Sequence, residues 1–382
     1  PTVSNAGVDQ TICSSTVTMA GNVPTVGSGV WSRVSGPNTP TITNVSSATT
    51  TITGLVAGTY VFRWTITSGP CPPSTDDVTV VVKPVPTVSN AGPDQNLCAQ
   101  TTATLAGNTA TVGTGQWTLV SGPNTPTITN ASSPTSTVTG LTTGVYVLRW
   151  TISNDPCPPS TDDVQITVYA NVTTPNAGPD QSLCGTVVTM AGNVPTVGSG
   201  VWSRVSGPNT PTITNASSAT TTITGLVAGT YVFRWTITNG PCTAYDEVTV
   251  TVLAGSTVSN AGPDQNLCAQ TTATLAGNTA TVGTGVWTQV SGASATITSP
   301  TSPTSTVTGL TTGVYVFRWT ISFSNCTPST DDVTITVYDV PTVSNAGVDQ
   351  TICSSTVTMA GNVPTVGSGV WSRVSGPNTP TI

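Results

Sequence analysis

The chain has 382 residues, of which 6% are charged, with a formal net charge of −7 and no histidine. So few cations exclude a nucleic-acid-binding surface, and the lack of histidine removes the usual proton switch between about pH 5 and 8. No apolar run approaches the roughly 18–20 residues of a membrane-spanning helix. No signal peptide is visible either, so export and anchoring signals are expected outside this segment.

The sequence repeats with a period of about 85 residues. The triplet Asn-Ala-Gly begins at residues 5, 90, 176, 260 and 345. This spacing predicts four full modules and a partial fifth, at residues 1–84, 85–170, 171–254, 255–339 and 340–382. Residues 1–42 are identical to residues 341–382. Proline-bearing linkers at 83–86 and 339–341 are expected to stiffen the array into a rod.

Within each module, short β-branched runs alternate with turn residues. The strands expected in the first module are, in chain order, one ending near Cys13, 16–20, 30–34, short strands around Ile42 and Ile52, 60–66, and a last strand that includes Val78, Val80 and Val82. No segment has a helical period. The prediction is therefore an all-β tandem array of immunoglobulin-like sandwiches.

The strand 60–66 is expected at the centre of the module, and it recurs at 146–152, 231–237 and 315–321. Its aromatic residues alternate with polar ones, as in a half-buried strand. The tyrosine hydroxyl is expected to return to the backbone at the preceding corner. Trp31 is expected to face Trp64 across the sandwich. The predicted core aromatics are Trp31, Tyr60, Trp64, Trp117, Tyr146, Trp150, Trp202, Tyr231, Trp235, Trp287, Tyr315 and Trp319.

Two cysteines occur in each full module, and the spacing between them is nearly constant from module to module. This regularity, without C-x-x-C or histidine, favours structural disulfides over zinc and indicates export. The expected pairs lie within modules: Cys13 with Cys71, Cys98 with Cys157, Cys184 with Cys242, and Cys268 with Cys326, with Cys353 left over. Under tension such a bridge would shield the loop that it closes and leave about a third of each module free to lengthen.

Acidic doublets precede the last strand of each module. Because neighbouring strand residues point to opposite faces, the second acid is expected to meet the outward arginine of the adjacent strand. The predicted ion pairs are Arg63 with Asp77, Arg149 with Asp163, Arg234 with Glu247, and Arg318 with Asp332. A calcium site at Asp9, Asp76 and Asp77 is kept as an alternative, although calcium needs six to eight oxygens. No other cofactor is expected.

Catalysis is not expected, since no nucleophile has a histidine base and adjacent carboxylates cannot face each other across a sugar. The function predicted is a mechanical spacer in a cell-surface protein. Two alternatives remain: an array of weak carbohydrate-binding modules, and an accessory region of a secreted enzyme.

The motif at 90–95, followed by Trp117 and Val120-Ser121-Gly122-Pro123, resembles the PKD superfamily of extracellular β-sandwich repeats. The fuller pattern is similar to the tandem modules of giant surface adhesins of gliding Bacteroidota, the SprB type. That resemblance implies type IX secretion, attachment at the bacterial outer surface, adhesion and gliding motility. It also implies two kinds of partner: a surface polysaccharide or substratum, and outer-membrane motility machinery reached through other regions.

Overall fold

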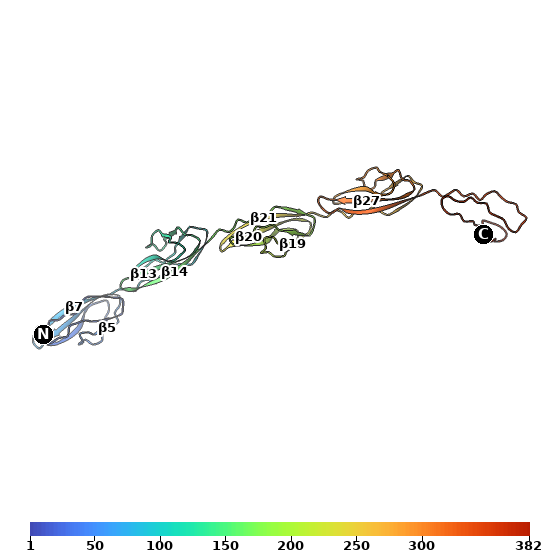
Figure 1. Ribbon diagram of the computed structural model, residues 1–382. Coiled ribbons are helices and arrows are strands. Elements are labelled where there is room, and N and C mark those ends of the chain that lie inside the picture. Colours follow the sequence, from blue (N-terminus) through green and yellow to red (C-terminus); the bar gives the residue numbers. More distant parts are fainter. The chain divides into compact units, whose positions relative to one another are not determined.

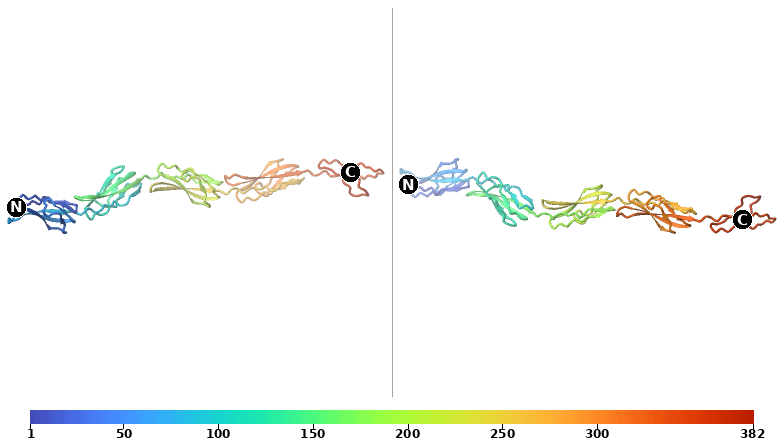
Figure 2. Two further views of the ribbon diagram at one scale, coloured as in Figure 1. Left: turned by 90° about the horizontal axis from the view of Figure 1, so that it is seen from below. Right: turned by 90° about the horizontal axis from the view of Figure 1, so that it is seen from above.

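The computed structural model describes all 382 residues, and its 28 strands gather into four modules (Figure 1). Figure 2 shows the same four strand-bearing modules from two further directions. Residues 341–382 form no strand. No helix long and apolar enough to cross a lipid bilayer occurs in the structure.

Each module is a sandwich of one four-stranded and one three-stranded sheet. In module 1 the four-stranded sheet has the order β1-β7-β6-β3, with β1 at Gln10–Ile12, β7 at Ser74–Val82, β6 at Gly58–Thr67 and β3 at Ser28–Ser35. The three-stranded sheet has the order β2-β5-β4, at Thr16–Thr18, Thr51–Thr53 and Thr41–Ile42. Strand β1 runs parallel to β7, whereas β3, β6 and β7 are antiparallel neighbours.

The other three modules repeat this topology. Module 2 has the sheets β10-β13-β14-β8 (Thr114–Ser121, Gly144–Asn154, Cys157–Tyr169, Gln95–Cys98) and β11-β12-β9 (Thr127–Ile128, Thr137–Thr139, Thr102–Thr104). Module 3 has β15-β21-β20-β17 (Gln181–Leu183, Cys242–Val252, Gly229–Asn239, Ser199–Ser206) and β16-β19-β18 (Val187–Thr189, Thr222–Thr224, Thr212–Ile213). Module 4 has β22-β28-β27-β24 (Gln265–Cys268, Ser329–Tyr338, Gly313–Ser322, Thr284–Ser291) and β23-β26-β25 (Thr272–Thr274, Thr306–Thr308, Thr296–Ile297).

The core of module 1 follows from the alternation in β6. Tyr60, Phe62, Trp64 and Ile66 are fully buried, while the intervening side chains are partly exposed. All twelve aromatic residues predicted for the four cores are buried. Burial of this apolar surface is the main stabilising contribution that each module makes for itself.

One expectation about the core is wrong. Trp31 and Trp64 do not face each other across the sandwich, because β3 and β6 are neighbours in one sheet and the two residues are register partners. Their ring centroids lie 5.0 Å apart with a 37° tilt. Gly29 precedes Trp31 on the same face, and a Cβ at Gly29 would lie 2.0 Å from the Trp64 indole. The glycine therefore makes room for a side-by-side indole pair on one sheet.

The corner before β6 is closed by the Tyr60 hydroxyl, as expected from the sequence. This oxygen accepts a hydrogen bond of 2.9 Å from the backbone N–H of Val56 and donates one to the Asn38 side chain. Asn38 in turn donates to the carbonyl of Gly54 over 2.8 Å. The tyrosine thus ties the loop after β3 to the loop after β5.

The chain divides into two compact units. The first comprises Pro1–Pro175, Val194–Gly200 and Thr236–Tyr245, and the second comprises Asn176–Asn193, Val201–Trp235 and Asp246–Ile382. The boundary passes through module 3, so that residues 194–200 and 236–245 of this module belong with modules 1 and 2. Each of the disulfides described below lies within one unit.

Candidate functional site: the joints between modules

The first cysteine of each module lies where the chain leaves that module. Because β1 is parallel to β7, its last residue, Ile12, is the register partner of Val82, and the N–H of Lys83 donates to the Ile12 carbonyl over 2.8 Å. Cys13 follows directly. Equivalent bonds hold in the other modules, from Ala99 to Tyr169, from Leu253 to Leu183 and from Ala269 to Tyr338.

The second cysteine lies at the opposite end, where the chain enters the module. Cys71 precedes β7, whose first residue, Ser74, accepts a hydrogen bond of 2.9 Å from the backbone N–H of Ser4. The length of β7 therefore separates the two cysteines of module 1 by about 30 Å, at roughly 3.3 Å per residue. A disulfide tolerates Cα separations of about 4.4–6.8 Å.

The expected disulfides within modules are therefore wrong. The first cysteine of each module is instead bonded to the second cysteine of the next module. The bonds are Cys13–Cys157, Cys98–Cys242 and Cys184–Cys326, with Cα separations of 4.9, 5.1 and 5.2 Å. Cys71, Cys268 and Cys353 are free and exposed. Each full module is still covalently braced, but to its neighbour.

Constant spacing did not reveal this pairing because every offset recurs in a repeated sequence. The sequence separations of the observed pairs, 144, 144 and 142, are as regular as those of the pairs expected within modules. The informative signal was strand direction. A first strand parallel to the last one ends at the exit, whereas the sixth strand, antiparallel to the last, ends at the entrance.

Polar contacts accompany each disulfide. At the first joint, the Asn154 side-chain amide donates to the Pro84 carbonyl over 2.7 Å. At the second, Asn239 donates to the Ala170 carbonyl over 2.9 Å, and Gly240, with φ of 58°, approaches the Tyr169 ring so closely that a Cβ would lie 2.4 Å from it. The bridged cysteines Cys157, Cys242 and Cys326 are buried. The joints are packed contacts as well as covalent links.

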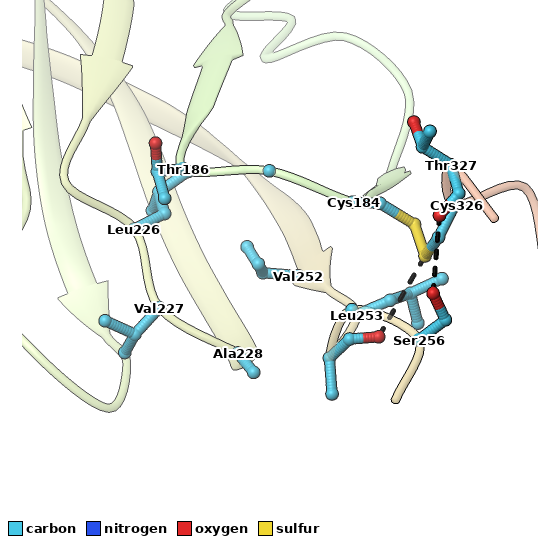
Figure 3. A pocket seen from close by; sticks show the side chains of 13 residues that line it. Cys184, Thr186, Leu226, Val227, Ala228, Val252, Leu253, Ser256, Cys326 and Thr327 are labelled. Carbon is cyan, nitrogen blue, oxygen red and sulfur yellow. Dashed lines mark hydrogen bonds between the residues drawn. A yellow bond between two sulfur atoms is a disulfide. The ribbon is translucent and has the colours of Figure 1, made fainter. Parts of the chain in front are cut away.

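The third joint borders a pocket of about 500 Å³ (Figure 3). The Cys184–Cys326 disulfide lies on one side of it, and Leu226, Val227 and Ala228 line the other. The Ser256 hydroxyl donates to the Thr327 carbonyl over 3.3 Å beside the disulfide. No charged side chain lines this pocket, so it holds no group for acid-base chemistry.

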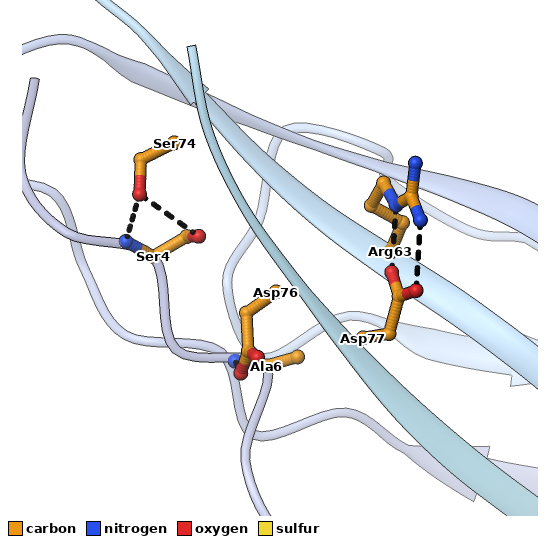
Figure 4. A network of polar contacts seen from close by, with 6 residues as sticks. All are labelled: Ser4, Ala6, Arg63, Ser74, Asp76 and Asp77. Atoms are coloured by element: carbon orange, nitrogen blue, oxygen red, sulfur yellow. Dashed lines mark hydrogen bonds and ion pairs between the residues drawn. The ribbon is translucent and has the colours of Figure 1, made fainter.

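The Asn-Ala-Gly-x-Asp motif fastens the entering chain to the last strand, a role that its sequence alone did not suggest. The Asp76 carboxylate accepts from the Ala6 N–H over 2.7 Å, and Asp9 accepts from the Thr79 N–H over 2.8 Å. Figure 4 shows the first of these bonds beside the Ser4–Ser74 pair. The counterparts of Asp76 are Asp162, Asp246 and Asp331, and those of Asp9 are Asp94, Asp180 and Asp264.

The four predicted ion pairs form. Arg63 donates through Nε and Nη2 to the two oxygens of Asp77 at 2.7 and 2.8 Å (Figure 4). The remaining pairs are Arg149–Asp163, Arg234–Glu247 and Arg318–Asp332. The hydrogen bond from arginine lowers the pKa of Asp77, Asp163 and Asp332. These side chains are about two-fifths exposed, so each pair contributes little to stability.

The calcium alternative stays a prediction. Asp9, Asp76 and Asp77 each have a protein partner, namely Thr79, Ala6 and Arg63. No group of three or more cysteine or acidic side chains is assembled in a way that would hold a metal ion. Binding of calcium at this place would require the carboxylates to give up these contacts.

Comparison with known proteins places the four modules in one domain family. A family of PKD domains of the KIAA0319-like type matches residues 6–82, 91–168, 177–252 and 261–337. The mouse dyslexia-associated protein KIAA0319-like protein is 30% identical over 168 residues, which cover 40% of this chain and 16% of that protein. The human dyslexia-associated protein KIAA0319 is 25% identical over 226 residues, covering 54% of this chain and 21% of the human protein. The chain therefore matches a minor part of either relative.

Among solved structures, the solution structure of the PKD domain from the KIAA 1837 protein is 29% identical, covering 24% of this chain and 92% of that chain with a TM-score of 0.21. Drosophila OTK extracellular domains 3–5 match with 12% identity and a TM-score of 0.35, over 66% of this chain and 96% of that one. The family match covers most of the sequence, one copy in each module. The chain belongs to the family of KIAA0319-like PKD domains and carries four such domains in tandem.

Proposed function

We propose that this array is a mechanical spacer of an extracellular protein, which holds a binding region at a distance without catalysing a reaction. The observation that carries the proposal is the pairing of cysteines between consecutive modules. A disulfide within a module would stabilise only that module. A disulfide between modules fixes the end of one against the beginning of the next, which is what a spacer requires.

Two covalent connections at each joint support a stiff array. The peptide linker is one connection and the disulfide is the other, so that a module is held to its neighbour at two points of its end surface. The asparagine contacts to linker carbonyls add a third. Disulfides persist in oxidising compartments, which supports an extracellular location.

The carbohydrate-binding alternative has less support. Sugar rings stack on exposed aromatic faces, whereas all eight tryptophans of modules 1–4 are buried. The acids of the doublets are likewise engaged with backbone N–H groups or arginines. We therefore rank the spacer first. Accessory service to a secreted enzyme would use the array in the same mechanical way.

The sequence resemblance extends the proposal to a bacterial surface adhesin. In that form, type IX export delivers the protein, the array stands on the outer surface, and regions beyond this segment contact motility machinery and a polysaccharide or substratum. The support is the motif pattern around residues 90–95 and 117–123. Deletion of the array from such a protein is expected to abolish surface adhesion while leaving export intact.

Small-angle X-ray scattering of the full chain tests the spacer directly. The oxidised protein is expected to give the pair-distance distribution of a rod. A variant with all six bridged cysteines changed to serine is expected to show a shorter maximum dimension and greater flexibility. Identical curves for the two would contradict the proposal, and so would specific binding of the isolated chain on a glycan array.

A further inference from the structure

We propose that the disulfides carry tension past the folded modules along a covalent path that bypasses most of the chain. This inference rests on the proposed spacer function and states how the spacer bears load. It replaces the expectation that a fixed part of every module would remain free to lengthen, because that expectation assumed bridges within modules.

The bonds fall into two interleaved tracks. Cys157, bonded to Cys13 of module 1, lies only a short way before Cys184, which is bonded to Cys326 of module 4. The route Cys13–Cys157–Cys184–Cys326 therefore connects the first module to the fourth through a single short peptide segment. We call this route the first track. The Cys98–Cys242 bond belongs to the second track and lies outside this route.

The peptide segment of the first track is already nearly straight in the folded protein. It begins with β14, from Cys157 to Tyr169, and a β-strand rises about 3.3 Å per residue, close to the limit of an extended chain. Residues 181–183 are again a strand, β15. Tension has little slack to take up before it reaches the disulfides.

Most of each module is then shielded from load. Residues 14–156 lie in the loop closed by Cys13–Cys157, and residues 185–325 lie in the loop closed by Cys184–Cys326. A chain held at its two ends transmits force through about a quarter of its peptide bonds and through two disulfides. Unfolding of a shielded module would not lengthen the protein.

Single-molecule stretching of the full chain, attached at residues 1 and 382 with the free cysteines blocked, tests this. At about 3.6 Å per residue, the oxidised protein is expected to reach a contour length of about 340 Å. After reduction it is expected to reach about 1,370 Å, with separate unfolding steps of the modules. Equal contour lengths in the two conditions would overturn the proposal.

A matched pair of variants separates a load-bearing bridge from a merely stabilising one. Cys98→Ser with Cys242→Ser removes the second-track bond, and its contour length is expected to stay at about 340 Å. Cys13→Ser with Cys157→Ser removes the same number of bonds, yet load must now detour through module 1, giving about 760 Å. Equal lengthening of both variants would refute the two-track arrangement, while leaving the scattering test of the spacer unaffected.

Discussion

Residues 1–42 and 341–382 have the same sequence and different structures. The first copy forms β1, β2, β3 and β4, whereas the second forms no strand. Trp31 is 1% exposed and its counterpart Trp371 is 37% exposed, and Met19 and Met359 differ in the same way, at 1% and 50%. The shared sequence therefore specifies its strands only in company.

What the second copy retains is the local part of the fold. The Thr342 hydroxyl accepts from the N–H groups of Thr365 and Val366, as Thr2 does in the first copy from Thr25 and Val26. Asn345 and Asn362 repeat the bonds of Asn5 and Asn22. What it lacks are the partners of β1 and β3, which in module 1 are β7 and β6. Turn chemistry is encoded locally, and strand pairing is not.

The largest expected effect comes from supplying the missing strands. Appending a copy of residues 43–84 after Ile382 is expected to complete a fifth module and bury Trp371, because β6 and β7 equivalents would then be present. The appended cysteine, equivalent to Cys71, is expected to bond to Cys268, so that the free thiols fall from three to two. Tryptophan emission and non-reducing peptide mapping measure the two results.

A control separates folding from bridging in this extended chain. With serine in place of the appended cysteine, Trp371 is still expected to become buried while Cys268 stays free. A bond from the appended cysteine to Cys353 would contradict the rule that pairs first and second cysteines of consecutive modules.

The next largest effect is expected from one substitution made in both copies. Trp31→Ala removes an indole from a packed core, which typically costs about 3–5 kcal/mol, so hydrogen exchange in module 1 should accelerate by about two to four powers of ten. Trp371→Ala is expected to change the exchange of modules 1–4 very little. Comparable effects at the two positions would mean that the second copy packs as the first does.

The same contrast explains how far the sequence could predict the structure. Strand positions, the Tyr60 corner, the buried aromatics and the Arg63–Asp77 pair follow from alternation and turn residues, which act over a few positions. The disulfide partners and the side-by-side placement of Trp31 and Trp64 depend on sheet order and on the parallel pairing of β1 with β7. That pairing joins the two ends of a module in the sequence, and a repeat period cannot distinguish one module from the next.

A smaller effect is expected at Asn38, which lies in the first copy but receives its partner from beyond it. Its side chain accepts from the Tyr60 hydroxyl and donates to the Gly54 carbonyl. Asn38→Ala would leave the buried hydroxyl one partner short and is expected to cost about 1–3 kcal/mol. Asn378→Ala, at the exposed counterpart, serves as the control. Denaturant unfolding followed by module-resolved hydrogen exchange measures the difference, and equal losses at both sites would refute this role.

The smallest effect is expected from the Arg63–Asp77 pair, which links the two strands that the second copy lacks. The hydrogen bond from Arg63 lowers the pKa of Asp77 below the ordinary 3.8 in the folded state. The pair therefore adds stability above about pH 4, and this contribution is lost as the pH falls through the lowered pKa. Because both side chains are largely solvated, Arg63→Gln is expected to change module opening at pH 6 by no more than about a few-fold.

Two measurements check this last prediction. An NMR titration of the Asp77 carboxyl should give a pKa nearer 3.8 in Arg63→Gln than in the unaltered protein, and the stability gap between the two proteins should close below about pH 3. If the gap at pH 6 matched that of Trp31→Ala, the ion pair would be what organises the first copy. A small gap that disappears in acid instead assigns the difference between the two copies to apolar burial against β6, with the ion pair setting only the register of β6 on β7.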